Sequence, residues 1–196
     1  MKWQQVFACY NYQGNTGIGK LRYCPICGTE CELQPENDRL RPACPKCGFI
    51  QYRNPSPAVS VLIVDDGKIL LGKRAGWNFE GGKWCFPCGY IEYDEDFLTA
   101  GRREVREETG LDVAITGIIN VTHNFFNEGL HTLVVVLAAR VTGGTLQPND
   151  DLTELRWFGP DEPLPELAFE SDRMIIDYFR QGKLTRYIDI QSQTSR

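Results

Sequence analysis

The hydrophobic pattern of the chain first predicts a core built of strands. Ala58–Val64 is apolar except for Ser60 and rich in branched residues, and its length fits a buried strand. Asp65–Gly67 predicts a hairpin turn into a second strand over Lys68–Lys73. Further strands are predicted over residues 115–126, 131–141 and 155–158.

Two other segments have helical periodicity. Asp94 is predicted to cap a helix over Glu95–Thr109, and Gly110 to end that helix in a left-handed conformation. A second helix is predicted over Ser171–Gly182, because apolar side chains recur there every three or four positions. Strands combined with two helices predict an α/β fold, an α/β/α sandwich with a mixed sheet.

Three glutamates, Glu104, Glu107 and Glu108, share one face of the first predicted helix. Glu104 and Glu108 are four positions apart and repel each other, and the nearby arginines are too few to neutralise the cluster. Divalent cations such as Mg²⁺ bind carboxylate oxygens and would supply the missing positive charge. A solvated acidic helix surface is the alternative.

The spacing of residues around these acids carries more information. Gly89 is followed after five residues by Glu95, after seven more by Arg103-Glu104-Val105, and then, across single-residue gaps, by Glu107-Glu108 and Gly110-Leu111. This pattern resembles the Nudix box at every defined position. The resemblance implies a hydrolase that uses Mg²⁺ or Mn²⁺ to cleave nucleoside diphosphates linked to another moiety.

The same resemblance implies roles for individual residues. Glu107 would be a further metal ligand or a base acting through water, while Arg103 would pair with Glu95 and orient the metal shell. Gly89 would allow a close approach of the backbone at the substrate loop. The metal ligands would be the side chains of Glu104, Glu107 and Glu108 and the backbone carbonyl of Cys88.

Cysteine spacing predicts a second metal site. Cys24 and Cys27, and then Cys44 and Cys47, form two Cys-x-x-Cys pairs separated by 16 residues, each followed by glycine. Four thiolates at this spacing are typical of a zinc ribbon, whose Zn²⁺ stabilises the fold and has no open position for catalysis. Disulfide bonds are the alternative. The predicted organisation is an N-terminal extension over 1–20, the ribbon over 21–52, a Nudix hydrolase domain over 53–190 and a tail over 191–196.

A third Cys-x-x-Cys, Cys85-Phe-Pro-Cys88, lies just before the box. In the family this place is taken by a turn, and we expect a turn here. A redox pair or a second metal site is the alternative.

The combination of ribbon and box resembles two branches of the Nudix family, the NADH pyrophosphatases and a zinc-ribbon group of ADP-ribose or FAD pyrophosphatases. The NADH branch carries Ser-Gln-Pro-Trp-Pro-Phe-Pro after its box, whereas this chain has LDVAITG over Leu111–Gly117. The resemblance therefore implies hydrolysis of ADP-ribose or FAD with release of AMP. An NADH pyrophosphatase, a nucleoside-triphosphate housecleaning enzyme and a non-catalytic zinc module that binds nucleotide or nucleic acid are the alternatives.

Substrate contacts are expected from loops and strand ends near the box. Arg74, at the end of the second predicted strand, resembles the family's phosphate-binding basic residue, with a surface ion pair as the alternative. Phe125 is a candidate for stacking on a base. Carboxylates that would supply the base or a further metal ligand are Glu128, Asp151 and Glu154.

Charge and hydropathy limit the partners. The 196-residue chain has a net charge of −5, which argues against sequence-independent binding of nucleic acid. No apolar run reaches the length of a membrane span, and residues 1–5 lack the core of a signal peptide. We therefore expect a small-molecule nucleotide substrate and a cytoplasmic location, with organelle targeting left open. Family resemblance adds a homodimer as one possible state.

Overall fold

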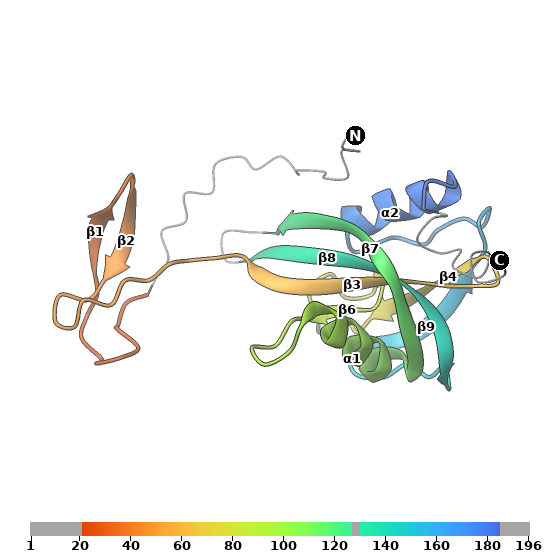
Figure 1. Ribbon diagram of the computed structural model, residues 1–196, viewed down its shortest axis with the longest axis horizontal. Coiled ribbons are helices and arrows are strands. Elements are labelled where there is room, and N and C mark those ends of the chain that lie inside the picture. Colours follow the sequence, from red (N-terminus) through yellow and green to blue (C-terminus); the bar gives the residue numbers. More distant parts are fainter. Residues whose placement is uncertain (1–20, 127–129, 185–196) are drawn as a thin grey trace, which may run out of the picture. The chain divides into compact units, whose positions relative to one another are not determined.

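The computed structural model describes residues 21–126 and 130–184, which divide into two compact units. The larger unit comprises residues 57–124 and 132–184, and the smaller one residues 21–56 with the described residues of 125–131. Figure 1 shows the elements of both units along the chain. The predicted extension over 1–20 and tail over 191–196 lie outside the described residues, and the predicted domain limits stay predictions.

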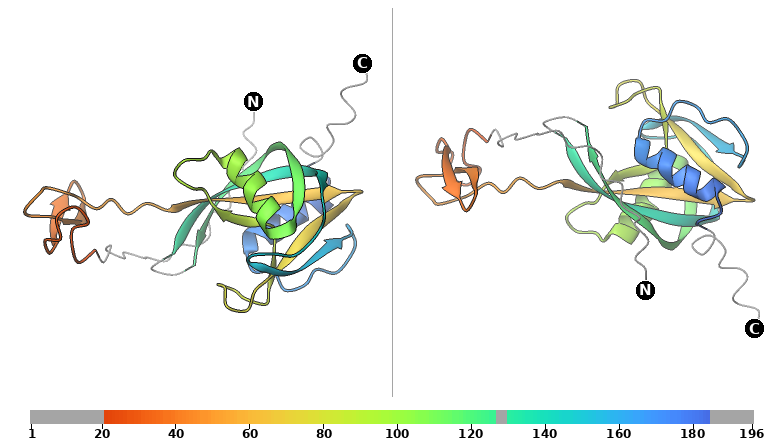
Figure 2. Two further views of the ribbon diagram at one scale, coloured as in Figure 1. Left: turned by 90° about the horizontal axis from the view of Figure 1, so that it is seen from below. Right: turned by 90° about the horizontal axis from the view of Figure 1, so that it is seen from above.

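Seven strands form one sheet. Off its main path, β6 (Cys88–Tyr90) pairs with β3, and β9 (Leu152–Phe158) pairs with β4. Helices α1 (Phe97–Thr109) and α2 (Glu170–Arg180) cover opposite faces of the sheet (Figure 1, Figure 2). The predicted α/β/α sandwich with a mixed sheet is confirmed. The strands of the main path are, in spatial order, β5 (Trp84–Cys85), β4 (Lys68–Arg74), β3 (Ser56–Asp65), β8 (His131–Gly144) and β7 (Leu111–Phe125).

The apolar run of β3 serves two hydrophobic cores. Leu62 belongs to the core that contains Ile175 of α2, and the preceding Val61 belongs to the core that contains Val105 of α1. Since successive side chains of a strand point to opposite faces, a strand between two helical layers is apolar at nearly every position. Each fully buried side chain of this kind contributes about 1.5–3 kcal/mol.

The first helix begins two residues later than predicted. Asp96 is the N-cap, and its Oδ1 accepts two backbone N–H groups of the first turn at 2.8 and 2.9 Å. The prediction of Asp94 as the cap is therefore wrong. Glu95 lies in the preceding turn, where its carboxylate accepts the N–H of Glu92 at 3.0 Å. The C-terminal prediction is confirmed, since Gly110 ends the helix with a φ of 72°.

Other boundaries also differ from the sequence-based ones. β7 and β8 are longer than predicted, and β9 begins at Leu152, three residues earlier than expected. The short strands β5 and β6 were not predicted, because their two and three residues take their conformation from pairing with β4 and β3. Helix α2 ends at Arg180, two residues before its predicted end. In the described ranges, neither helix has the length and apolar character to span a membrane.

Candidate active site and zinc centre

The box residues meet where β6 lies against α1. The N–H of Cys88 donates to Oε2 of Glu108 at 2.9 Å, so the backbone before the helix is tied to its last turns. Glu108 is 1% exposed and Glu104 is 8% exposed. A solvated acidic surface is therefore excluded for these two residues, whereas the side chain of Glu107 is 48% exposed.

Gly89 lies directly against the carboxylate of Glu104. A Cβ atom added to Gly89 would overlap that carboxylate, so the contact requires a residue without a side chain. The position of Gly89 is fixed by the sheet, in which it pairs with Val59 of β3. An alanine at this position would therefore displace Glu104 and leave the backbone little freedom to move.

One guanidinium group, that of Arg103, connects the other box carboxylates. Its Nε and Nη2 donate to the two carboxylate oxygens of Glu95 at 3.1 and 2.5 Å. Its Nη1 donates to Glu104 at 2.7 Å and to Glu107 at 2.9 Å. Nη2 also donates to the backbone carbonyl of Tyr90 at 3.0 Å. The two-pronged contact with Glu95 fixes the plane of the guanidinium group and thereby orients Glu104 and Glu107.

The electrostatics of this site favour a bound cation. Burial raises the pKa of Glu108 well above its ordinary value, and burial also raises the pKa of Glu104. By contrast, hydrogen bonds from Arg103 lower the pKa of Glu95. An ionised carboxylate buried in this way is destabilised unless a cation neutralises it. The oxygens of Glu104 and Glu108 therefore fit a hard divalent ion such as Mg²⁺ or Mn²⁺.

Asp150 also belongs to this region, although the sequence analysis did not select it. Its negative charge contributes to the raised pKa of Glu104. Its backbone φ is 51°, a conformation that aspartate adopts in tight turns. The N–H of the preceding Asn149 donates to the carbonyl of Glu108 at 3.1 Å, which ties this turn to the end of α1. The hydrophobic pattern does not predict that such a residue lies near the glutamates. The only sequence feature that points to it is the run of polar residues Asn149–Asp151, which predicts a turn.

Two acids predicted near the substrate make other contacts. The carbonyl of Asp151 accepts the N–H of Ala75 at 2.8 Å. Glu154 lies on β9, and its Oε2 is 3.9 Å from Nζ of Lys73. Glu128, the third such acid, lies outside the described residues. Their predicted contacts with substrate stay predictions.

The side chain of Arg74 is partly buried at the end of β4. Its Nε donates to a backbone carbonyl at 2.8 Å. Its Nη1 lies 3.7 Å from Sγ of Cys85 and 4.0 Å from Sγ of Cys88, and its guanidinium carbon lies 5.3 Å from the ring centroid of Phe169. Its charge also interacts with Glu108. These contacts direct Arg74 toward the box and not toward the surface ion pair considered for it.

Phe125, the candidate for base stacking, lies at the end of β7. Its ring stacks on that of His131, the first residue of β8, with 3.8 Å between the ring centroids. Phe125 is 37% exposed. One side of its ring therefore already has an aromatic partner.

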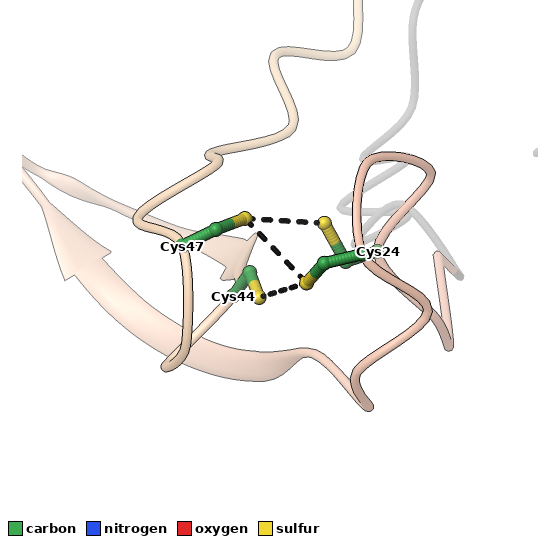
Figure 3. Close-up of side chains that lie close together, drawn as sticks. Cys24, Cys44 and Cys47 are labelled. Carbon is green, nitrogen blue, oxygen red and sulfur yellow. Dashed lines mark hydrogen bonds between the residues drawn. The ribbon is translucent and has the colours of Figure 1, made fainter.

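The four predicted zinc ligands converge in the smaller unit (Figure 3). The sulfur atoms of Cys24, Cys27, Cys44 and Cys47 lie within 4.8 Å of one another, and three of the Sγ–Sγ distances are 3.6, 3.5 and 3.7 Å. Four sulfurs at about 2.3 Å from a central Zn²⁺ would be about 3.8 Å apart. All four cysteines are free thiols, which excludes the disulfide alternative. Within residues 21–126 and 130–184, no other group of three or more potential His, Cys, Asp or Glu ligands is gathered as tightly.

Each cysteine pair lies on a tight turn built by the glycine that follows it. Gly28 and Gly48 have φ values of 71° and 75°, which suit glycine far better than any other residue. Their N–H groups donate to the carbonyl of the first cysteine of each pair at 2.9 and 3.0 Å. The antiparallel strands β1 (Glu32–Glu36) and β2 (Arg39–Ala43) connect the two turns.

Comparison with known proteins identifies the family. The Nudix domain profile matches residues 54–179, and the chain belongs to the Nudix family of hydrolases. An ADP-ribose pyrophosphatase from Methanocaldococcus jannaschii is 36% identical over 132 residues, which cover 66% of this chain and 76% of that protein. The crystal structure of a Nudix hydrolase from Nitrosomonas europaea superimposes with a TM-score of 0.75 at 28% identity and covers 86% of this chain and 96% of that one.

A second group of relatives carries another name. The NAD-capped RNA hydrolase NudC from Pseudomonas aeruginosa is 31% identical over 164 residues, which cover 81% of this chain. The chain spans 56% of that protein's length. Since the Nudix profile matches residues 54–179 only, the similarity to NudC extends beyond the Nudix domain.

Proposed function

We propose that this chain hydrolyses the pyrophosphate bond of a nucleoside diphosphate linked to another moiety, with ADP-ribose or FAD as substrate and AMP as a product. The observation that carries the proposal is the pair Glu104 and Glu108, two carboxylates buried against the Cys88–Gly89 backbone. A diphosphate also needs positive charge around it, and divalent cations bound by these acids would provide that charge. The similarity to an ADP-ribose pyrophosphatase supports the choice of substrate.

The proposed ligands of Mg²⁺ or Mn²⁺ are the side chains of Glu104, Glu107 and Glu108 and the carbonyl of Cys88. Once bound, such an ion neutralises phosphate oxygens and makes water a better nucleophile at neutral pH. The protein orients the ligands, because the N–H of Cys88 holds one oxygen of Glu108 and Arg103 holds Glu104 and Glu107.

Side chains around Glu104 and Glu108 would carry out the other steps, which are deprotonation of the water and binding of the phosphate groups. Glu107 or Asp150 is in our proposal the base that takes the proton from the attacking water, because the charges of both carboxylates act on Glu104. Arg74 supplies a positive charge near Glu108 for the phosphate groups. Glu95 touches no reacting atom in this scheme and acts by fixing Arg103.

The relatives named NudC favour a second candidate, a substrate that contains an NAD or NADH diphosphate. The longer match with NudC supports this reading, whereas the motif that follows the box in NADH pyrophosphatases is absent from residues 111–117. Both candidates place an AMP unit on one side of the diphosphate. The site described above would serve either of them.

We propose further that the ion of the smaller unit is Zn²⁺ in a purely structural role. Four thiolates fill all positions of a tetrahedral ion and leave none for water. A zinc module that merely binds nucleotide or nucleic acid would not need the buried acids of the larger unit.

The direct test is an assay of purified protein with Mg²⁺ or Mn²⁺ against ADP-ribose, FAD, NADH, NAD-capped RNA and nucleoside triphosphates. AMP release from ADP-ribose or FAD, faster than product release from the other substrates, is the expected result. Faster turnover of NADH or NAD-capped RNA would support the second candidate. Binding without turnover of any substrate would overturn the proposal in favour of a binding module.

A further inference from the structure

A pair of cysteines outside the zinc centre lies next to the proposed active site. Cys85 ends β5 and Cys88 begins β6, and only Phe86 and Pro87 lie between them in the sequence. Both sulfurs lie near the same atom, Nη1 of Arg74, at 3.7 and 4.0 Å. Cys85 is fully buried, whereas Cys88 is partly exposed.

The backbone of this segment is coupled to the box from two sides. The N–H of Cys88 holds the carboxylate of Glu108, and the next residue, Gly89, lies against Glu104. From the other side, Oδ2 of the buried Asp172 accepts the N–H of Phe86 at 3.1 Å. A change in the bonding between the two thiols would therefore shift the backbone that positions both glutamates.

We propose that Cys85 and Cys88 form an oxidisable dithiol, which a hydroperoxide converts to a disulfide that reversibly lowers the hydrolase activity. Two cysteines separated by two residues have a spacing that accommodates a disulfide. Bond formation requires the two sulfurs to approach to about 2.05 Å. The loss of activity rests on the proposed function, whereas formation of the disulfide does not.

The chemistry balances with hydrogen peroxide as the oxidant. The neighbouring Cys85 and burial raise the pKa of Cys88, and the charge of Arg74 opposes that rise, so the reaction begins with loss of the Cys88 proton. The sulfur then attacks one peroxide oxygen, the O–O bond breaks, and the products are a sulfenic acid and, after protonation of the leaving hydroxide, water. The Cys85 sulfur then attacks the sulfenic sulfur and expels a second hydroxide, which leaves as water after protonation. Two thiols lose two electrons and two protons in total, and one peroxide becomes two waters. An added dithiol reverses the reaction by thiol–disulfide exchange.

Peptide mass spectrometry can detect this disulfide without any activity assay. Cleavage after Lys83 and Arg102 yields one peptide, residues 84–102, in which Cys85 and Cys88 are the only cysteines. After treatment of the zinc-loaded protein with hydrogen peroxide and alkylation of free thiols, the expected peptide lacks both alkyl groups and two hydrogens. Recovery of this peptide fully alkylated, or with only higher oxidation of Cys88, would overturn the proposal.

The activity arm uses Cys85→Ser, because Cys85 is not among the proposed metal ligands. Untreated Cys85→Ser is expected to retain activity. Peroxide that abolishes most of the wild-type activity should cause a smaller loss in this variant, because the variant can form the sulfenic acid at Cys88 but not the disulfide. Cys31→Ser, which changes a cysteine outside the zinc set, is the matched control and should respond like the wild type. Equal reversible loss in wild type and Cys85→Ser would contradict the proposal.

Two measurements distinguish oxidation of Cys85 and Cys88 from oxidation of the zinc cysteines and from failure of the proposed hydrolase function. Zinc release during peroxide treatment, followed with a chromogenic chelator, shows whether the ribbon cysteines were oxidised instead. If no substrate is hydrolysed at all, the proposed function fails, while the peptide still decides whether the dithiol closes. A disulfide that forms with no effect on a measurable activity would overturn the regulatory part.

Discussion

At the scale of single residues, Glu108 combines a cost to folding with a proposed role in catalysis. Its carboxylate is buried against Cys88, and burial raises its pKa. We expect Glu108→Gln to lower the rate by about 10³, because charge that is needed in the transition state is lost. Without added divalent ion the variant should melt at a higher temperature than the wild type, because an unpaired buried charge is removed.

Initial rates and thermal melts of both proteins measure these two effects. Glu170→Gln, which changes an exposed glutamate at the start of α2, is the control and should leave both quantities nearly unchanged. A Glu108→Gln enzyme with wild-type activity would refute the assignment of this residue.

Asp172 offers a test through pH. Burial raises its pKa to about 7, although the hydrogen bond from Phe86 and the charge of Arg74 oppose that rise. Between its ordinary pKa near 4 and this value, the folded state binds a proton that the unfolded state has released, so the contribution of Asp172 to stability falls as pH rises. Asp172→Asn should therefore be more stable than the wild type at pH 8, by about 2–4 kcal/mol.

Urea unfolding at several pH values provides the measurement. The advantage of Asp172→Asn should shrink as the pH falls below about 7 and vanish at about pH 3 and below, where the wild-type carboxyl is protonated in both states. Asp177→Asn changes an exposed residue of the same helix and serves as the control. A stability difference that is independent of pH would show that Asp172 is not held at a raised pKa.

At the scale of secondary structure, the N-cap of α1 can be tested, because the sequence predicts Asp94 and the structure shows Asp96. Asp96→Ala should destabilise the protein by about 1 kcal/mol, because two N–H groups of the first turn lose their acceptor. Asp94→Ala should change stability little, since Asp94 is exposed and precedes the cap. Chemical denaturation of both variants decides between the two residues, and a larger effect at Asp94 would restore the sequence-based boundary.

Prediction from sequence succeeded where the residues of one element determine that element's conformation by themselves. The structure confirms three features that are each recognisable within a short stretch of sequence. These are the strand β3 with apolar side chains on both faces, the left-handed Gly110 at the end of α1, and the clustered cysteine pairs. Prediction failed for β5 and β6 because their conformation comes from partner strands. It also missed Asp150, whose proximity to Glu104 arises only when the turn after β8 folds back to the end of α1.

At the scale of the whole molecule, the two units differ in what stabilises them. The apolar side chains that are buried within the described part of the smaller unit are small and belong to Cys24, Pro42, Ala43 and Cys44, while Leu33 and Leu40 are about half exposed. We therefore expect the smaller unit, which has little apolar core, to depend on the metal ion proposed for its four cysteines. The larger unit has two extended cores of its own.

Removal of zinc should therefore unfold the smaller unit and spare the larger one. Amide hydrogen exchange is the measurement, and we expect protection in β1 and β2 to be lost after chelation while the interior of β3 stays protected. Reconstitution with Zn²⁺ is the control and should restore protection. Unchanged exchange in β1 and β2 after verified loss of zinc would show that the ion is not a folding element.

The central claim is that Glu104 and Glu108 bind divalent cations at the site of diphosphate cleavage. Its most direct test is a Mn²⁺ titration of zinc-loaded protein, followed by the electron paramagnetic resonance of free Mn²⁺, for the wild type, Glu104→Gln, Glu108→Gln and the control Glu170→Gln. We predict that wild type and control bind Mn²⁺ alike and that each of the other two variants binds it at least about tenfold more weakly. Equal Mn²⁺ affinity in all four proteins would contradict the account.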